Sequence, residues 1–131
     1  MYKKVVCLVL LLMLCIFSVA SAIEISPMWT LINNVTNYFS IDSGGIATMI
    51  AYVHGKRDVQ KIILSNFLQR YENNEWVTIK SWSSEHNGDW AGWEKRYAVV
   101  SGYTYRLVTY CNAYDGTNWE MASLISNPQT Y

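Results

Sequence analysis

Proline is nearly absent from this chain of 131 residues, and the two that occur, Pro27 and Pro128, lie near its ends. Proline cannot donate a hydrogen bond within a β-ladder, so its absence leaves the long middle segment free to form sheet. After the first 22 residues, no segment places apolar side chains at helical spacing. These two absences favour an all-β domain.

An excess of positive charge is also missing. The chain has ten Lys and Arg against ten Asp and Glu, which gives a formal net charge of +0. Lys3 and Lys4 belong to the first 22 residues, so the remainder carries eight cations against ten anions and a charge of −2. Because no basic stripe is present, the sequence argues against nucleic acid as a partner.

Motifs for catalysis and for metal binding are missing as well. There is no Gly-x-Ser-x-Gly elbow for a nucleophilic serine. The only histidines, His54 and His86, fit no zinc spacing, and the segment from Glu85 to Asp89 offers few oxygen ligands for calcium. We therefore expect a protein that is not an enzyme and that has neither a metal nor a cofactor.

Cysteine is scarce, and two of the three, Cys7 and Cys15, lie in the first 22 residues. Cys111 alone remains, so the domain after residue 22 cannot form an internal disulfide. Its place in the alternating pattern Tyr105-x-Leu107-x-Thr109-x-Cys111-x-Ala113 predicts a buried, inert thiol.

The one long apolar run is at the N-terminus. Lys3 and Lys4 precede a nearly unbroken apolar stretch from Val5 to Phe17, and Ala20-Ser21-Ala22 follows as a small-x-small cleavage pattern. This predicts a signal-peptide helix over residues 1–22, cleaved before Ile23, and an extracellular domain over residues 23–131 that does not stay at the membrane. A retained membrane anchor is the alternative, although a spanning helix needs about 20 apolar residues.

Period-two alternation dominates the rest of the chain. It predicts about seven strands at 35–41, 46–54, 61–71, 76–83, 93–100, 103–113 and 119–125, with hairpin turns at 42–45 and 72–75 and a polar loop at 84–92. Short strands with turn signals every 8–12 residues are typical of an immunoglobulin-like or fibronectin-like sandwich. The expected core consists of Met49, Ala51, Val53, Ile62, Leu64, Leu68, Ile79, Val99, Tyr105 and Leu107.

Tyrosines open the predicted strand at 103–113. In sandwiches of this class, a tyrosine at such a place bonds through its hydroxyl to backbone a few residues upstream. We expect Tyr103 or Tyr105 to form this corner, which is a structural role.

Tryptophans are the best candidates for a binding site. Trp90 and Trp93 fall in the predicted loop beside Asp89, and exposed rings next to polar groups are suited to hold sugars. Trp76 and Trp82 are six residues apart in one predicted strand, which places them on one face roughly 20 Å apart. The alternative for each pair is packing: Trp93 and Trp90 against the core and the loop, and one of Trp76 and Trp82 between the sheets.

Several segments, in this order, resemble one family of small exported proteins from Gram-positive, largely clostridial, bacteria. They are Ser43-Gly44-Gly45, Leu68-Gln69-Arg70-Tyr71, Val77-Thr78-Ile79-Lys80-Ser81-Trp82 and Gly102-Tyr103-Thr104-Tyr105-Arg106. The resemblance implies a secreted domain with an immunoglobulin-like or fibronectin-like fold. It implies no activity, and residues 85–93 depart from the Ser- and Gly-rich segment of the family.

These observations predict a secreted, non-enzymatic domain that binds an extracellular partner, either a glycan or a cell-surface protein. The alternative is a structural or assembly module in which an edge strand pairs with another chain. The sequence leaves the oligomeric state open.

Overall fold

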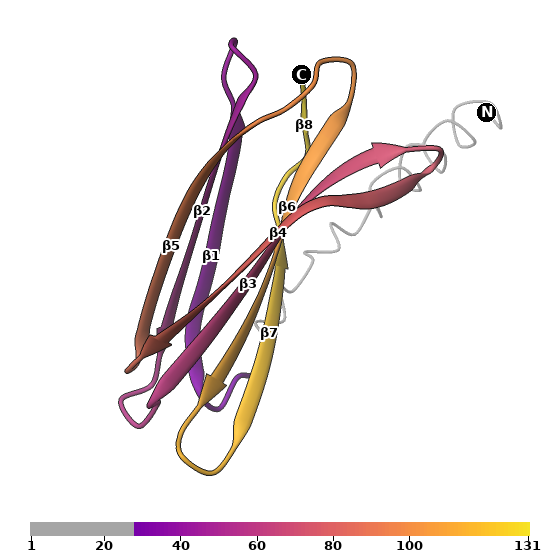
Figure 1. Ribbon diagram of the computed structural model, residues 1–131. Helices are drawn as coiled ribbons and strands as arrows, with labels where there is room; N and C mark the ends of the chain where they lie inside the picture. The colour runs from indigo at the N-terminus through magenta and orange to yellow at the C-terminus, as the bar shows by residue number, and fades with distance from the viewer. Residues whose placement is uncertain (1–27) are drawn as a thin grey trace, which may run out of the picture.

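The computed structural model describes residues 28–131, which form eight β-strands and contain no helix (Figure 1). The strands are β1 (Ile32–Ile41), β2 (Ile46–Gly55), β3 (Lys61–Glu72), β4 (Glu75–Asn87), β5 (Trp90–Ala98), β6 (Thr104–Tyr114), β7 (Trp119–Ile125) and β8 (Gln129–Thr130). The all-β prediction is confirmed. The predicted signal-peptide helix lies outside the described residues, and within them no helix could span a membrane.

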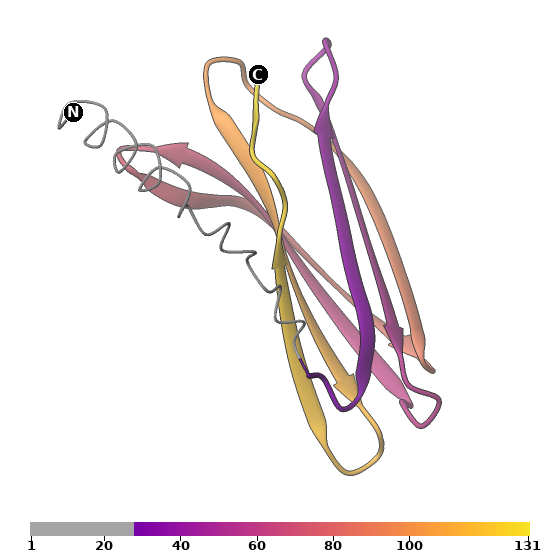
Figure 2. The same cartoon turned by 180° about the vertical axis from the view of Figure 1, so that it is seen from behind.

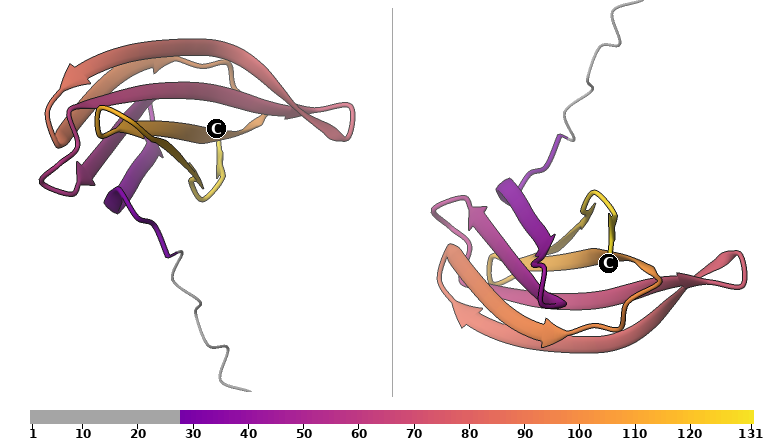
Figure 3. Two further views of the ribbon diagram at one scale, coloured as in Figure 1. Left: turned by 90° about the horizontal axis from the view of Figure 1, so that it is seen from below. Right: turned by 90° about the horizontal axis from the view of Figure 1, so that it is seen from above.

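The strands form two antiparallel sheets that face one another (Figures 1 and 2). The small sheet has the order β1-β2-β5, and the large sheet has the order β4-β3-β6-β7, with β8 also paired to β6. On one side β4 turns directly into β5, and on the other β1 faces β7 and β8 (Figure 3). The β3–β4 hairpin projects beyond the small sheet (Figure 1).

The core between the sheets has two apolar clusters. One contains Val53, Ile62, Leu64 and Cys111, and the other contains Met49, Leu68, Tyr105 and Leu107. The core prediction is confirmed for eight of its members, all fully buried: Met49, Ala51, Val53, Ile62, Leu64, Leu68, Tyr105 and Leu107. Ile79 and Val99 are only partly buried and pack against the second cluster.

A short polar chain crosses the core. Thr109 and Asn66 are fully buried on the large sheet, and the Thr109 hydroxyl donates to Asn66 Oδ1 at 2.8 Å. Asn37 of the small sheet donates from Nδ2 to Thr109 Oγ1 at 3.3 Å. Buried polar groups need such partners, so these two linked hydrogen bonds help to fix how the two sheets lie against each other.

Two structural roles proposed for single residues are found. The Tyr105 hydroxyl donates to the Val100 carbonyl at 2.6 Å, which is the expected corner, and the Tyr105 side chain is fully buried. Cys111 is a buried free thiol. Its burial, together with the nearby Glu120 carboxylate, raises the pKa of the Cys111 thiol to about 12, so the reactive thiolate is scarce at neutral pH.

The predicted loop at 84–92 is wrong. β4 continues to Asn87 and β5 begins at Trp90, so only Gly88 and Asp89 connect them. The polar residues at the end of β4 stay extended because β3 supplies a backbone partner for each of them, as in the pairs of Leu64 with Ser84 and Lys61 with Asn87. Gly88 takes a positive φ of 96°, which suits the sharp turn.

Candidate functional site

The structure separates the five predicted binding residues. Trp90 and Asp89 lie together at the start of β5, Trp82 and Trp93 lie between the sheets, and Trp76 lies on the far face of the large sheet. The predicted site therefore does not exist as one surface, and each residue has a different environment.

Trp93 and Trp82 are structural residues. Trp93 is opposite Ala51 on the inner face of β5 and packs against both apolar clusters. Its ring centroid lies 5.6 Å from that of Trp82, which also faces inward, opposite the buried Asn66. Of the two interpretations of these rings, packing against the core is therefore confirmed.

Trp76 and Trp82 are on opposite faces, so the prediction of one shared face is wrong. The register of β3 and β4 shifts where Leu68 pairs with Lys80 and Gln69 pairs with Thr78, which leaves Ile79 as an extra residue in β4. One extra residue reverses the face of every residue beyond it.

Trp76 consequently points away from the core, at the projecting β3–β4 hairpin. Its ring packs on Tyr71 with centroids 5.1 Å apart, and the Arg106 guanidinium lies 4.2 Å from the ring centroid. Both neighbours belong to the outer face of the large sheet, so the Trp76 ring already contacts side chains of its own domain.

Trp90 is the candidate that presents a ring to solvent. It lies on the outer face of the small sheet, opposite His54, and is 50% exposed. Its indole lies against Gly92, two residues along the same face of β5: a Cβ at Gly92 would be 2.5 Å from Trp90 Cη2 and 2.8 Å from Cζ2. Glycine at this position lets the ring lie close against the strand while half of the side chain stays exposed.

Two more aromatic rings share this outer face, and the sequence reasoning missed both. Tyr52 is 43% exposed, and its ring centroid lies 6.4 Å from that of Trp90 at an interplanar angle of 30°. Tyr38 on β1 is 56% exposed. The alternation in β1 and β2 was the available signal. Tyr52 is next to the buried Val53 and Tyr38 is next to the buried Phe39, so each tyrosine must face outward.

Charge is sparse around these rings. Along the outer face of β5, Glu94 and Arg96 carry opposite charges, and Arg96 lies 3.9 Å from the Asp42 carboxylate. Asp89 contributes through its backbone, since its carbonyl accepts from the Gly55 amide at 2.7 Å. The face therefore offers flat apolar rings beside amide and hydroxyl groups, such as those of Asn34 and Thr36, with no net charge.

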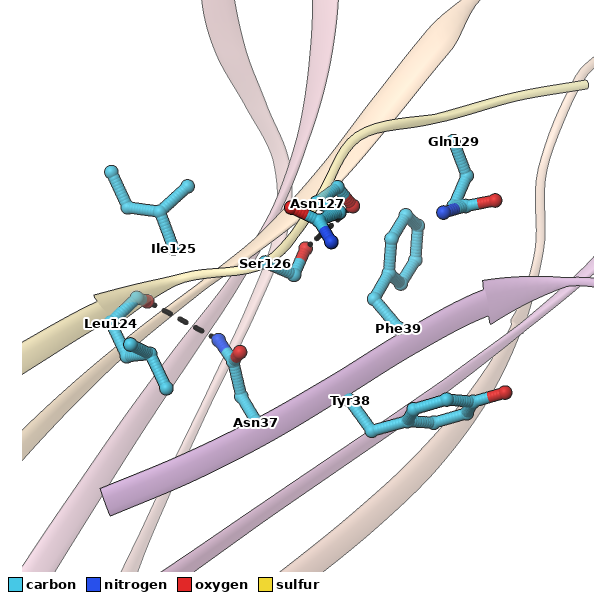
Figure 4. Close-up of a pocket in the computed structure, with 8 residues that line it drawn as sticks. All are labelled: Asn37, Tyr38, Phe39, Leu124, Ile125, Ser126, Asn127 and Gln129. Atoms are coloured by element: carbon cyan, nitrogen blue, oxygen red, sulfur yellow. Dashed lines mark hydrogen bonds between the residues drawn. The ribbon is translucent and has the colours of Figure 1, made fainter. Parts of the chain in front are cut away.

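A cavity of about 400 Å³ lies where β1 faces β7 and β8 (Figure 4). Two of its polar side chains form hydrogen bonds: Asn37 Nδ2 donates to the Leu124 carbonyl at 3.2 Å, and the Ser126 hydroxyl donates to the Asn127 carbonyl at 3.2 Å. It is lined by Asn37, Tyr38, Phe39, Leu124, Ile125, Ser126, Asn127 and Gln129. In residues 28–131, no three His, Cys, Asp or Glu side chains gather where they could hold a metal ion.

Comparison with known proteins adds little to this geometry. No family model and no curated protein matches the chain. One solved structure, the sporulation control protein Spo0M from Bacillus subtilis, is similar at 17% sequence identity and a TM-score of 0.42. The match covers 70% of this chain and 47% of that one.

Proposed function

We propose that this protein is a secreted, non-enzymatic immunoglobulin-like domain that binds a glycan through the outer face of its small sheet. The export signal rests on the pattern of residues 1–22. The binding role rests on the single observation that the Trp90 indole lies over Gly92 and stays 50% exposed.

The strand order supports the immunoglobulin-like assignment. In that architecture strands A, B and E belong to one sheet and C, F and G to the other. If β1, β2 and β5 are A, B and E, then β3, β4, β6 and β7 are C, C′, F and G, in the order C′-C-F-G. The Tyr105 corner at the start of β6 falls at the start of strand F, where such corners occur.

The ring geometry supports a sugar as the ligand. A pyranose with equatorial hydroxyls has an apolar face of C–H groups, which fits the open face of an aromatic ring, while its hydroxyls need polar neighbours. Trp90 supplies such a ring, and Asn34 and Thr36 lie on the same outer face. An exposed aromatic ring in a neutral polar setting is suited to an uncharged sugar.

The test is binding to a glycan array and to insoluble peptidoglycan, chitin and cellulose. We expect Trp90→Ala to weaken binding at least about tenfold, because the stacking ring is lost. Gly92→Ala should do the same while keeping the indole, since the new Cβ must displace it. The free energy of unfolding of both variants should lie within about 1 kcal/mol of the wild-type value, because Trp90 is half exposed.

The matched control is Trp119→Ala. The exposed fraction of Trp119, 54%, is similar to the 50% of Trp90. Trp119, however, lies on β7 at the outer face of the large sheet. Its replacement should leave glycan binding unchanged. Equal binding by the wild type, Trp90→Ala and Gly92→Ala would contradict the proposal.

One observation favours a second candidate, assembly through an edge strand. β1 is a ten-residue edge strand with neither proline nor a charged residue, whereas edge strands β4 and β5 carry charges such as Lys80 and Lys95. Charge and proline normally protect an edge from pairing with another chain.

If β1 pairs with a second copy, light scattering should show a dimer that Thr36→Lys dissociates. A monomer at high concentration would contradict assembly through β1.

A further inference from the structure

The three residues that carry the exposed aromatic rings of the small sheet occupy diagonal positions on its three strands. Tyr52 is opposite Gly92 on β5 and opposite Thr36 on β1. Trp90 is displaced from Gly92 by two residues toward one end of the sheet. Tyr38 is displaced from Thr36 by two residues toward the other end. The order Trp90, Tyr52, Tyr38 therefore crosses β5, β2 and β1 in one direction.

Trp90 and Tyr52 are close neighbours, with ring centroids 6.4 Å apart. Diagonal positions on neighbouring antiparallel strands are separated by about 7–8 Å, and Tyr52 and Tyr38 occupy such positions. The three residues thus extend over roughly 14 Å, which is longer than one pyranose ring.

The face beside the rings has no net charge. Glu94 and Arg96 are its charged side chains and have opposite signs. The other positions facing outward next to the rings carry amide, hydroxyl, imidazole or apolar groups, among them Asn34, Thr36, His54 and Ile50. A glycan with negatively or positively charged sugars would meet no surface of opposite net charge on this face.

We propose that Trp90, Tyr52 and Tyr38 form a binding track for a linear, uncharged glycan of at least three units with equatorial substituents, such as a β-1,4-linked chain. This rests on the proposed glycan function and adds that one sugar stacks near each end of the track. Trp90 holds one end, and Tyr38 holds a unit that a monosaccharide or disaccharide on Trp90 does not reach.

The experiment measures the affinity of the full domain for soluble N-acetylglucosamine and glucose β-1,4 oligomers of one to six units by titration calorimetry. We expect affinity to rise with each unit until the chain fills the track and then to level off. Tyr38→Ala should lower affinity for the longer oligomers about tenfold and leave the disaccharide affinity unchanged. Trp90→Ala should weaken binding of every length.

Controls and contrary outcomes separate this inference from the function it rests on. Tyr110→Ala removes a tyrosine that is 39% exposed on the large sheet, away from the track, and should leave the affinity for every oligomer unchanged. Circular dichroism establishes that each variant is folded. Binding that depends on Trp90 but not on chain length or Tyr38 overturns the track and leaves the glycan function standing. Tighter binding of hyaluronan oligomers overturns the uncharged ligand, and binding of no oligomer overturns both proposals.

Discussion

Replacing Trp93 by alanine is expected to lower the free energy of unfolding by about 3 kcal/mol. Trp93 contacts both apolar clusters and packs on Trp82 with ring centroids 5.6 Å apart, so its removal opens a cavity where the clusters meet. Small domains are stable by only about 5–15 kcal/mol, which makes this loss a large share of the total. Urea unfolding followed by circular dichroism measures it.

Trp93→Phe and Trp90→Ala are the comparison variants for this stability measurement. Phenylalanine keeps part of the ring contact with Trp82 and should lose less stability than alanine. Trp90→Ala removes an equally large side chain from the same strand, three residues away, but from the exposed face, and should cost no more than about 1 kcal/mol. Similar losses for Trp90→Ala and Trp93→Ala would mean that the assignment of β5 faces is incorrect.

This contrast decides how binding experiments on the tryptophans must be read. Loss of glycan binding in Trp82→Ala or Trp93→Ala follows from loss of folded protein, because both rings lie between the sheets. Trp76 packs on Tyr71 and Arg106 at the outer face of the large sheet. Only Trp90, among the tryptophans named from the sequence, tests the proposed surface.

The strands and the core were predictable because each depends on local pattern. Alternation in β2 and β3 alone identifies Met49, Val53 and Leu64 as inward residues. The hairpin at 72–75 was equally readable: Asn73 and Asn74 both take positive φ, 51° and 64°, which two-residue hairpins between twisted strands require.

The faces of β4 were not predictable, because face depends on register with a partner strand. The bulge at Ile79 has no signature in β4 itself, and it places Trp76 and Trp82 on opposite faces. The polar end of β4 resembles a loop in composition, yet β3 holds it extended. Gly92 did offer a signal, since a glycine within a strand marks close approach by another group, here the Trp90 indole.

Neutralising Glu120 is expected to destabilise the protein by about 2 kcal/mol at neutral pH. Its carboxylate joins the two sheets where β1 faces β7: Oε1 accepts from the Thr30 amide at 2.6 Å, and Oε2 accepts from the amides of Leu31 and Ile32 at 2.7 and 2.8 Å. Partial burial raises the pKa of Glu120, but these amides and the Thr30 hydroxyl outweigh it, so its pKa is lowered overall.

The pH dependence has a definite sign. Because the pKa of Glu120 is lower in the folded state than its unfolded value of about 4.3, the carboxylate stabilises the fold fully above that value. The contribution is lost as pH falls through the lowered folded-state pKa. The stability difference between wild type and Glu120→Gln should therefore be constant near neutral pH and shrink as the pH falls below about 4.3 in urea titrations. Glu75→Gln, at the exposed β3–β4 hairpin, should show no such stability difference. A stability difference for Glu120→Gln that stays constant from neutral to acidic pH would contradict the stabilising role of the Glu120 carboxylate.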